Sequence, residues 1–105
     1  MLIARGGLRR AEVLGRQEVE LFYAVDPTMW NKGIATTIVT SALKLGFEQI
    51  GLESVIAFTL DANKASQRIA EKFSFSRKTR FEHAGLEHIL FRLTRAEFQR
   101  GAISL

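Results

Sequence analysis

The sequence contains no cysteine among its 105 residues, which excludes a disulfide framework, a thiolate zinc site and a cysteine nucleophile. Its two histidines, His83 and His88, are too few for a histidine-based metal site without help from carboxylates, so no metal is expected. No apolar run approaches the ~20 residues that span a bilayer, and Arg5 follows the first apolar residues too early for a signal peptide. These absences predict a soluble, cytoplasmic protein with no membrane partner.

The residues that are present form an ordinary globular composition with a basic balance. Hydrophobic residues make up 47% of the chain and charged residues 25%, and the length suits a single domain over residues 1–105. Fifteen Lys and Arg against eleven Asp and Glu give a net charge of +4, which favours anionic partners such as nucleic acid or a phosphate-bearing cofactor. The one basic cluster, Arg77-Lys78 with Arg80, fits a solvated strand face about as well as a binding patch.

Apolar patterning predicts an alternation of strands and helices. The expected elements are a strand within Leu2–Leu8, a strand over Glu18–Val25, a helix from Gly33 to about Ile50, a strand over Val55–Leu60, a helix after Asn63, and strands over Phe75–Phe81 and His88–Leu93. Gly51 is the expected end of the first helix, His83-Ala84-Gly85 joins the last two strands as an antiparallel hairpin, and Ala96–Gln99 adds a helical turn. Strand–helix–strand units around a mixed sheet indicate an α/β fold, or α+β sandwich.

The segment between the strand Glu18–Val25 and the first helix carries the clearest chemical signal. A helix beginning at Gly33 presents unpaired N–H groups and the positive end of its dipole, and the small Ala35 lets a phosphate approach the backbone. Lys32 adds a cation and Thr36 a hydroxyl at the same place. These features predict an anion site, with a packing or capping role as the alternative for Gly33. Because only one glycine is present and no Gly-Lys-Ser/Thr follows, the segment is neither a P-loop nor a dinucleotide-binding fingerprint.

Two motifs of the chain resemble those of a known family. The run Trp30-Asn31-Lys32-Gly33-Ile34-Ala35-Thr36 is similar to the acetyl-CoA signature of the GNAT superfamily of N-acetyltransferases, Gln/Arg-x-x-Gly-x-Gly/Ala. A leading tryptophan is typical of its ribosomal-protein N-terminal acetyltransferase branch. The second motif, Asn63-x-x-Ser66 followed by Glu71-Lys72-Phe73-Ser74-Phe75, is similar to that branch's Asn-x-x-Ser…Glu-Lys-x-Gly-Phe. The resemblance covers roughly residues 2–98.

The resemblance implies a truncated acyl-CoA N-acyltransferase fold, with a mainly antiparallel sheet and two helices. The strands Glu18–Val25 and Val55–Leu60 look like the family's fourth and fifth strands, and acetyl-CoA would enter where these two splay apart. The family's first strand, first two helices and second strand would precede residue 2. The chain therefore resembles the C-terminal, acetyl-CoA-binding portion of the fold.

The resemblance also implies which residues hold acetyl-CoA. Backbone groups of Ala24 and Val25 would pair with the pantetheine arm, and Asn63 and Ser66 would contact it from the other side. The backbone N–H groups that would hold the pyrophosphate belong to Asn31, Lys32, Gly33, Ile34, Ala35 and Thr36. Asn63 is also a natural N-cap for the second helix, a role that is compatible with contacting a ligand.

The implied reaction transfers an acetyl group from acetyl-CoA to a primary amine, either a protein N-terminus or a small molecule. An ammonium with a pKa near ~10 is mostly protonated at pH 7, so a base must take its proton and a donor must protonate the thiolate. A strand N–H near Tyr23 to Val25 would hold the thioester oxygen. Glu20, which shares its face with Glu18, is the candidate base, against a plain solvent-facing strand glutamate. Tyr23, the only tyrosine, is the candidate donor, against a core or pocket-wall aromatic.

The chain departs from the family pattern at three positions. Ala70 occupies the place on the second helix where many members carry the acid tyrosine. Ser74 stands where the family's Gly-Phe pair has its glycine, and Thr37 replaces a glutamate that is usual in this branch.

Two other functions are compatible with the sequence. The first is a basic nucleic-acid- or protein-binding module built on Arg77-Lys78 and Arg80, in which nucleic acid is the weaker partner because few aromatic residues alternate with basic ones. The second is a catalytically silent CoA-binding subunit that pairs with another chain. An exposed edge at the strand Leu2–Leu8 further predicts a homodimer or a swapped oligomer, because exposed edges tend to pair.

Overall fold

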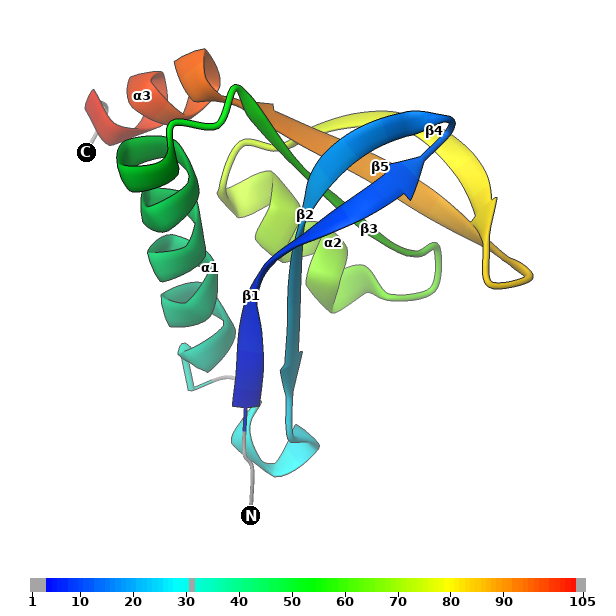
Figure 1. The fold of residues 1–105 in the computed structure, drawn as a ribbon. Helices are drawn as coiled ribbons and strands as arrows, with labels where there is room; N and C mark the ends of the chain where they lie inside the picture. The colour runs from blue at the N-terminus through cyan, green and yellow to red at the C-terminus, as the bar shows by residue number, and fades with distance from the viewer. Residues whose placement is uncertain (1–3, 31, 104–105) are drawn as a thin grey trace.

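The computed structural model describes residues 4–30 and 32–103, which form a five-stranded sheet and three α-helices (Figure 1). The elements in chain order are β1 (Ala4–Val13), β2 (Arg16–Val25), the 3-10 helix η1 (Pro27–Met29), α1 (Ile34–Lys44), its π-helical extension η2 (Leu45–Ile50), β3 (Ser54–Leu60), α2 (Lys64–Lys72), β4 (Ser76–His83), β5 (Leu86–Thr94) and α3 (Arg95–Ile103). Across the sheet the strand order is β1-β2-β3-β5-β4, and only the β2–β3 pair is parallel among the described strands. The predicted α/β class and mixed, mainly antiparallel sheet are confirmed.

The predicted elements are present, and several ends differ. β1 continues to Val13 because it pairs with β2 along its whole length, while Leu2 and Ile3 of the predicted strand lie outside the described residues. The predicted helical turn at Ala96–Gln99 is a full helix, α3. Thr94 and Glu97 begin it with a capping box, in which each backbone N–H donates to the other residue's side chain at 2.9 and 3.2 Å.

Helices α1 and α2 cover one face of the sheet. Apolar residues three and four apart place Val39, Ala42 and Leu43 on the inner side of α1, where each is at most 5% exposed. The buried sheet residues of this layer are Leu21, Val55, Ile89, Phe91 and Leu93. Phe47 of η2 stacks on Phe98 of α3 with ring centroids 4.9 Å apart, so α3 closes the end of the same layer.

The chain's own β1–β2 hairpin covers part of the other face. In Figure 1 this hairpin twists and arches across the sheet. Its tip places Val13 against Ile56, Phe81 and Leu90 in a second, smaller apolar cluster. Ile56 is thereby 0% exposed although no helix of the described chain packs on this side.

Within the described residues, no helix is both long enough and apolar enough to span a membrane.

Candidate functional site

The neighbouring parallel strands β2 and β3 diverge along their length. They pair in register at Glu20 and Ile56, and beyond this point residues of both strands line a cavity of about 320 Å³. Successive residues of a strand point to opposite faces of the sheet, so Phe22 lines the cavity from one face and Tyr23 from the other. The cavity therefore lies between the two strands and is lined by side chains from both faces of the sheet.

The wall on the helix side is formed by β2 and α2. The Tyr23 hydroxyl donates to Ser66 Oγ at 3.3 Å. Burial raises the pKa of Tyr23 above its ordinary value, and the bond to Ser66 only partly opposes this. The phenol is therefore protonated at neutral pH. Ser66 precedes Ala70 by one helical turn and both line the cavity, so the Tyr23 hydroxyl lies beside the same face of α2 as Ala70.

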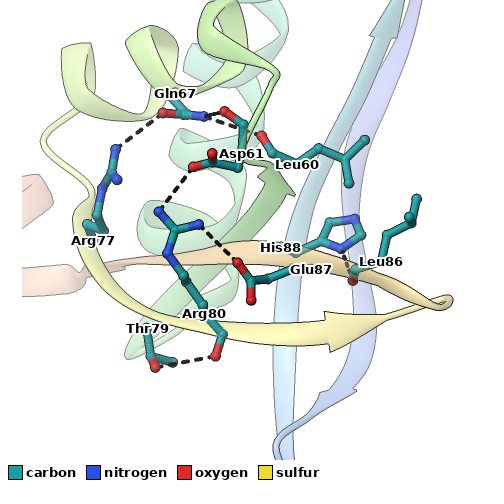
Figure 2. Close-up of polar contacts among 9 residues, drawn as sticks. All are labelled: Leu60, Asp61, Gln67, Arg77, Thr79, Arg80, Leu86, Glu87 and His88. Atoms are coloured by element: carbon teal, nitrogen blue, oxygen red, sulfur yellow. Dashed lines mark hydrogen bonds and ion pairs between the residues drawn. The ribbon is translucent and has the colours of Figure 1, made fainter.

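A capping bond and a buried glutamine hold the first turn of α2 in place. Asn63 Oδ1 accepts from the Ser66 backbone N–H at 3.1 Å, which confirms the predicted N-cap. Gln67 is 4% exposed and donates to the carbonyls of Leu60 and Asp61 at 3.3 and 2.8 Å. Figure 2 shows these bonds joining the end of β3 to the helix. Asn63 and Ser66 are thus fixed at the cavity wall where the sequence predicts pantetheine contacts.

The wall on the opposite side carries charged and aromatic side chains. Glu20 accepts from Arg9 Nε at 3.0 Å and from its Nη2 at 3.3 Å. The Arg9 guanidinium also lies 4.5 Å from the centre of the Phe22 ring, within the range of a cation–π contact. His83 and His88 line the same wall from the β4–β5 hairpin.

Glu18 and Glu20 are both buried, at 9% and 5% exposed, so the interpretation of Glu20 as a solvent-facing strand residue is wrong. The reason is that each carboxylate is held by an arginine from another strand of the sheet, Glu20 by Arg9 of β1 and Glu18 by Arg92 of β5. Glu18 accepts from Arg92 Nη2 at 2.6 Å and from its Nη1 at 2.9 Å. Those bonds lower the pKa of Glu18, because they favour the charged carboxylate. Of the two glutamates, Glu20 is the one that lines the cavity.

The predicted pyrophosphate site lies at the N-terminus of α1. Gly33 is the N-cap, with a φ of 75°, and no side chain caps the first turn, which also contains no acidic residue. A Cβ placed on Gly33 would meet no atom within 4 Å, so the space beside the turn is open. Lys32 is exposed next to it, and Asn31 lies outside the described residues. Open space, uncapped N–H groups and the helix dipole together fit an anion such as a phosphate.

The structure places only part of the predicted cofactor set around the cavity. Val39 of α1 lines the cavity, whereas Ala24, Val25 and the segment Lys32–Thr36 do not. Ile34, the first residue of α1, precedes Val39 by five positions, which corresponds to about 7.5 Å along the helix axis. A ligand that reaches both places must be extended along α1.

The loop between β2 and α1 is fixed by side-chain bonds. Trp30 Nε1 donates to the Val25 carbonyl at 2.9 Å, and Asp26 Oδ1 accepts from the Thr28 backbone N–H at 2.9 Å. The tryptophan of the predicted motif thus links the end of β2 to the loop that leads into α1.

The basic cluster on β4 is engaged within the chain. Arg80 forms ion pairs with Asp61 and Glu87 at 3.1 and 3.3 Å, and Arg77 donates to Gln67 Oε1 at 3.2 Å (Figure 2). These contacts support the interpretation of the cluster as a solvated strand face over that of a binding patch.

The departure at Ser74 has a structural explanation. Ser74 has a φ of 69°, in the left-handed region that favours glycine. The backbone bonds from Ser74 N to the Glu71 carbonyl at 3.0 Å and from Phe75 N to the Ala70 carbonyl at 2.9 Å form a Schellman motif that ends α2. Serine adopts here the conformation that glycine adopts more easily, at a cost of about 1 kcal/mol.

Sequence reasoning missed four cavity or support residues: Arg9, Gln67, His83 and His88. His83 and His88 flank the predicted hairpin turn, and pairing across it brings their ring centroids to 5.3 Å. The pairing register of the predicted hairpin could have indicated that the two histidines lie close together. Arg9 and Gln67 carry no local signal, because their partners come from other elements. Among the described residues, no three metal-ligating side chains gather in one place.

Comparison with known proteins identifies the family model that the chain fits. Residues 1–76 match the model for the acetyltransferase (GNAT) domain. Among curated proteins, the uncharacterized N-acetyltransferase YoaA of Bacillus subtilis (strain 168) is 27% identical over 62 residues. That stretch is 59% of this chain and 35% of the relative, so the chain spans well under half of that protein.

Solved acetyltransferase structures share the fold. A GNAT-family acetyltransferase from Bacillus anthracis superposes with a TM-score of 0.68 and 24% identity, over 87% of this chain and 58% of that one. A mutant of the spermidine/spermine N-acetyltransferase SpeG from Vibrio cholerae gives 0.71 and 16%, over 81% and 53%. The aminoglycoside acetyltransferase AAC(6')-Ib in complex with coenzyme A gives 0.72 and 19%, over 80% and 49%. The chain thus spans about half of the length of these structures.

Proposed function

Because the chain belongs to the GNAT acetyltransferase family, which uses acetyl-CoA, we propose that it transfers an acetyl group from acetyl-CoA to a primary amine. The observation that carries this proposal is the cavity between β2 and β3, which is lined from both faces of the sheet. Two substrates react when their reacting atoms are held about 3–3.5 Å apart. We place the cofactor at the helix-side lining of this cavity and the amine at the lining from the other face.

The N-terminus of α1 is the proposed site for the pyrophosphate. Its supporting features are the uncapped first turn, the open space beside Gly33 and the neighbouring cation of Lys32. We assign the contacting backbone to the predicted set Asn31, Lys32, Gly33, Ile34, Ala35 and Thr36. The separation between this turn and the cavity is consistent with an extended pantetheine arm that lies along β2, beside Ala24 and Val25, and meets Asn63 and Ser66.

Tyr23 is the proposed donor of a proton to the departing thiolate. It is protonated at neutral pH, its hydroxyl lines the cavity, and Ser66 orients it. The hydroxyl lies beside Ala70, the position of the acid tyrosine in many family members. A phenol from β2 would therefore supply, at nearly the same place, the group that α2 lacks.

Glu20 is the carboxylate proposed to face the amine. Arg9 engages both of its oxygens, and each oxygen keeps a further lone pair for an ammonium N–H. The family resemblance makes Glu20 the candidate base. In Glu20→Gln the amide keeps the shape of the side chain and removes its charge, so loss of transfer with intact CoA binding would support a role toward the amine.

The acceptor class is proposed as a primary amine because structural neighbours include a spermidine/spermine and an aminoglycoside N-acetyltransferase. A suitable panel contains spermidine, kanamycin, phenethylamine and a short peptide with a free N-terminus. Release of free thiol from acetyl-CoA in the presence of each amine measures transfer. Binding of CoA without transfer to any amine would contradict the enzyme and favour the silent CoA-binding subunit.

Cofactor binding is tested with a matched pair of glycine variants. Gly33 and Gly15 have nearly the same backbone, with φ of 75° and 76°, and a Cβ on either meets no atom within 4 Å. Gly33→Glu and Gly15→Glu therefore bring the same strain and charge to two places, and only the first lies at the proposed phosphate site. CoA at 100-fold excess over its Kd should stabilise the wild type and Gly15→Glu by ~2.7 kcal/mol and Gly33→Glu by nearly nothing. Equal stabilisation of both variants would contradict the site.

The finer assignments rest on the same proposal. From the motif that begins at Trp30, we propose that the chain belongs to the ribosomal-protein N-terminal acetyltransferase branch. We also propose that it corresponds to the acetyl-CoA-binding portion of the fold.

We further propose a cytoplasmic location and a homodimer or swapped oligomer. The described part of β1 is an edge of the sheet, and edge strands tend to pair. Sedimentation at rising concentration should reveal the oligomer, and a monomer at every concentration would contradict it.

A further inference from the structure

The amine-facing wall of the cavity contains two histidines to which the proposed function gives no role. His83 and His88 stand on the two strands of the β4–β5 hairpin, with ring centroids 5.3 Å apart. Phe58 packs edge-on against both, at 4.7 Å from His83 and 5.7 Å from His88. Phe81 completes the group at 6.1 Å from His88. Ring packing therefore holds both imidazoles at the wall opposite Tyr23.

The hydrogen bond of His88 determines which of its nitrogens carries the proton. Its Nδ1 lies 3.0 Å from the backbone carbonyl oxygen of Leu86, and Figure 2 shows this bond. A carbonyl oxygen accepts and cannot donate, so Nδ1 must carry the hydrogen. In the neutral ring Nε2 is then the unprotonated nitrogen with a free lone pair. Such a nitrogen is a proton acceptor.

The other titratable groups along the cavity are less suited to take a proton. Both oxygens of Glu20 already accept hydrogen bonds from Arg9, at 3.0 and 3.3 Å. Tyr23 is protonated, so it is a donor. Arg92 lies further along this face and is neutralised by Glu18. The remaining group that faces His88 is His83, whose ring has no backbone carbonyl to set its tautomer among the contacts described.

We propose that Nε2 of His88 takes the proton of the acceptor amine, directly or through one water molecule, an inference that rests on the proposed acetyl transfer. The ammonium first releases one proton to solvent; as the neutral amine nitrogen then bonds to the acetyl carbon, the carbon–sulfur bond breaks and a second proton of the nitrogen passes to His88. The sulfur receives a proton from Tyr23. Amine and thioester thereby become amide and thiol, His88 returns its proton to solvent, and Tyr23 regains one from solvent. Glu20 with Arg9 then holds the amine, and His88 acts as the base.

The test compares His88→Gln with His83→Gln, because both remove an imidazole from the same aromatic group. With the amine of the panel that the wild type acetylates fastest, His88→Gln should lower kcat/KM by roughly 100-fold, a size typical of a lost general base. It should also remove the limb of the pH profile that reports protonation of a base. His83→Gln should keep that limb, because the proposal gives His83 no proton to take. CoA binding, measured by calorimetry, should be the same in all three proteins.

A second measurement does not depend on turnover or on the stability of a variant. In wild-type protein with ¹⁵N-labelled histidine, long-range ¹⁵N–¹H spectra at pH 8 should show the His88 proton on Nδ1. A proton on Nε2 would overturn the proposal, and so would an unchanged rate and pH profile in folded His88→Gln. Absence of transfer by the wild type to every amine would overturn both this proposal and the proposed function, whereas transfer without His88 dependence overturns this one alone.

Discussion

The two faces of the sheet are buried by different means. On the face covered by α1 and α2, Leu43, Val55 and Leu93 are each 0% exposed and pack against other apolar side chains. On the opposite face, two glutamates of β2 are buried in ion pairs with Arg9 of β1 and Arg92 of β5. One face is therefore held mainly by non-directional apolar contact, whereas the other combines a smaller apolar cluster around Ile56 with charge pairs of defined geometry.

The two faces therefore differ in what they contribute, one mainly to the stability of the fold and the other to the candidate site. Apolar packing contributes roughly in proportion to the area removed from water, so the helix-covered face supplies most of the folding free energy. Burying a charge is costly unless a partner is well placed, so a buried ion pair is weak evidence for stability. Glu20, His83 and His88 all belong to the charged face and line the cavity. The face on which buried charges cost folding free energy is therefore also the face whose polar side chains would contact the proposed acceptor.

The largest effect is expected from breaking the apolar face. Leu43→Ala should lower the free energy of unfolding by about 3 kcal/mol, because it leaves a cavity at a fully buried position. Urea denaturation followed by circular dichroism measures this loss. Leu45→Ala in the adjoining turn is a matched control, since Leu45 is 43% exposed and should lose far less. Equal losses would contradict the assignment of this face as the main source of stability.

Breaking one ion pair should have the next largest effect. Arg92→Met should lower the free energy of unfolding by about 2 kcal/mol, because Glu18 stays charged and buried with only the longer, 3.9 Å ion pair to Arg16. The double variant Glu18→Leu with Arg92→Met removes both charges and should lie within about 1 kcal/mol of wild type. Chemical denaturation of the three proteins tests this. A double variant that is less stable than Arg92→Met would mean that the pair itself is a major source of stability.

Acid should remove the contribution of Glu18 more gradually. Its pKa is lowered in the folded state by the bonds from Arg92, so its contribution is complete above the unfolded value of about 4.3. As pH falls below that value toward the folded pKa, the unfolded chain takes up the proton first and the contribution is lost. The gap in unfolding free energy between wild type and Glu18→Gln should therefore be constant near pH 7 and close below about pH 4. A gap independent of pH would show that the charge of Glu18 is not involved.

The smallest effect is expected at backbone positions outside both faces. Ser74 and Ala84 have φ of 69° and 53°, one at the end of α2 and the other in the β4–β5 turn. Ser74→Gly and Ala84→Gly should each raise the free energy of unfolding by about 0.5–1 kcal/mol, since glycine relieves the strain but loses more entropy on folding. Thermal melts of both variants measure it. A loss of stability at Ser74 would indicate that the serine side chain itself holds the end of α2.

Much of the fold was predictable because its signals are local. The spacing of Ile34, Ile38 and Ala42 predicts α1, and the alternation of strands with helices predicts the mixed sheet. The π-helical end of α1 and the length of α3 were not predicted. Both segments are packed together through tertiary contacts such as the stacking of Phe47 on Phe98. Such contacts join residues that are distant in sequence, so local patterns do not predict them.

The site was predictable in part. The N-cap of Asn63 and the open first turn at Gly33 follow from short-range backbone rules, and the sequence anticipated both. The burial of Glu20 was missed, because it depends on Arg9, 11 residues earlier on a paired strand. The approach of His88 to the cavity depends in the same way on the register of the β4–β5 hairpin.

The sequence by itself determined the order of the elements, the N-cap of α2 and the residue types available for chemistry, since those follow from local backbone preference and periodicity. Only the tertiary structure decided that β2 and β3 diverge, that both strand glutamates are paired with arginines, and that two histidines reach the cavity. The physical reason is that strand register and sheet twist bring distant residues together, and no local rule contains either. The absence of cysteine excluded disulfides, thiolate metal sites and a cysteine nucleophile, and the small number of histidines argued against a histidine-based metal site. The fold places the two histidines of the chain at one wall of the cavity.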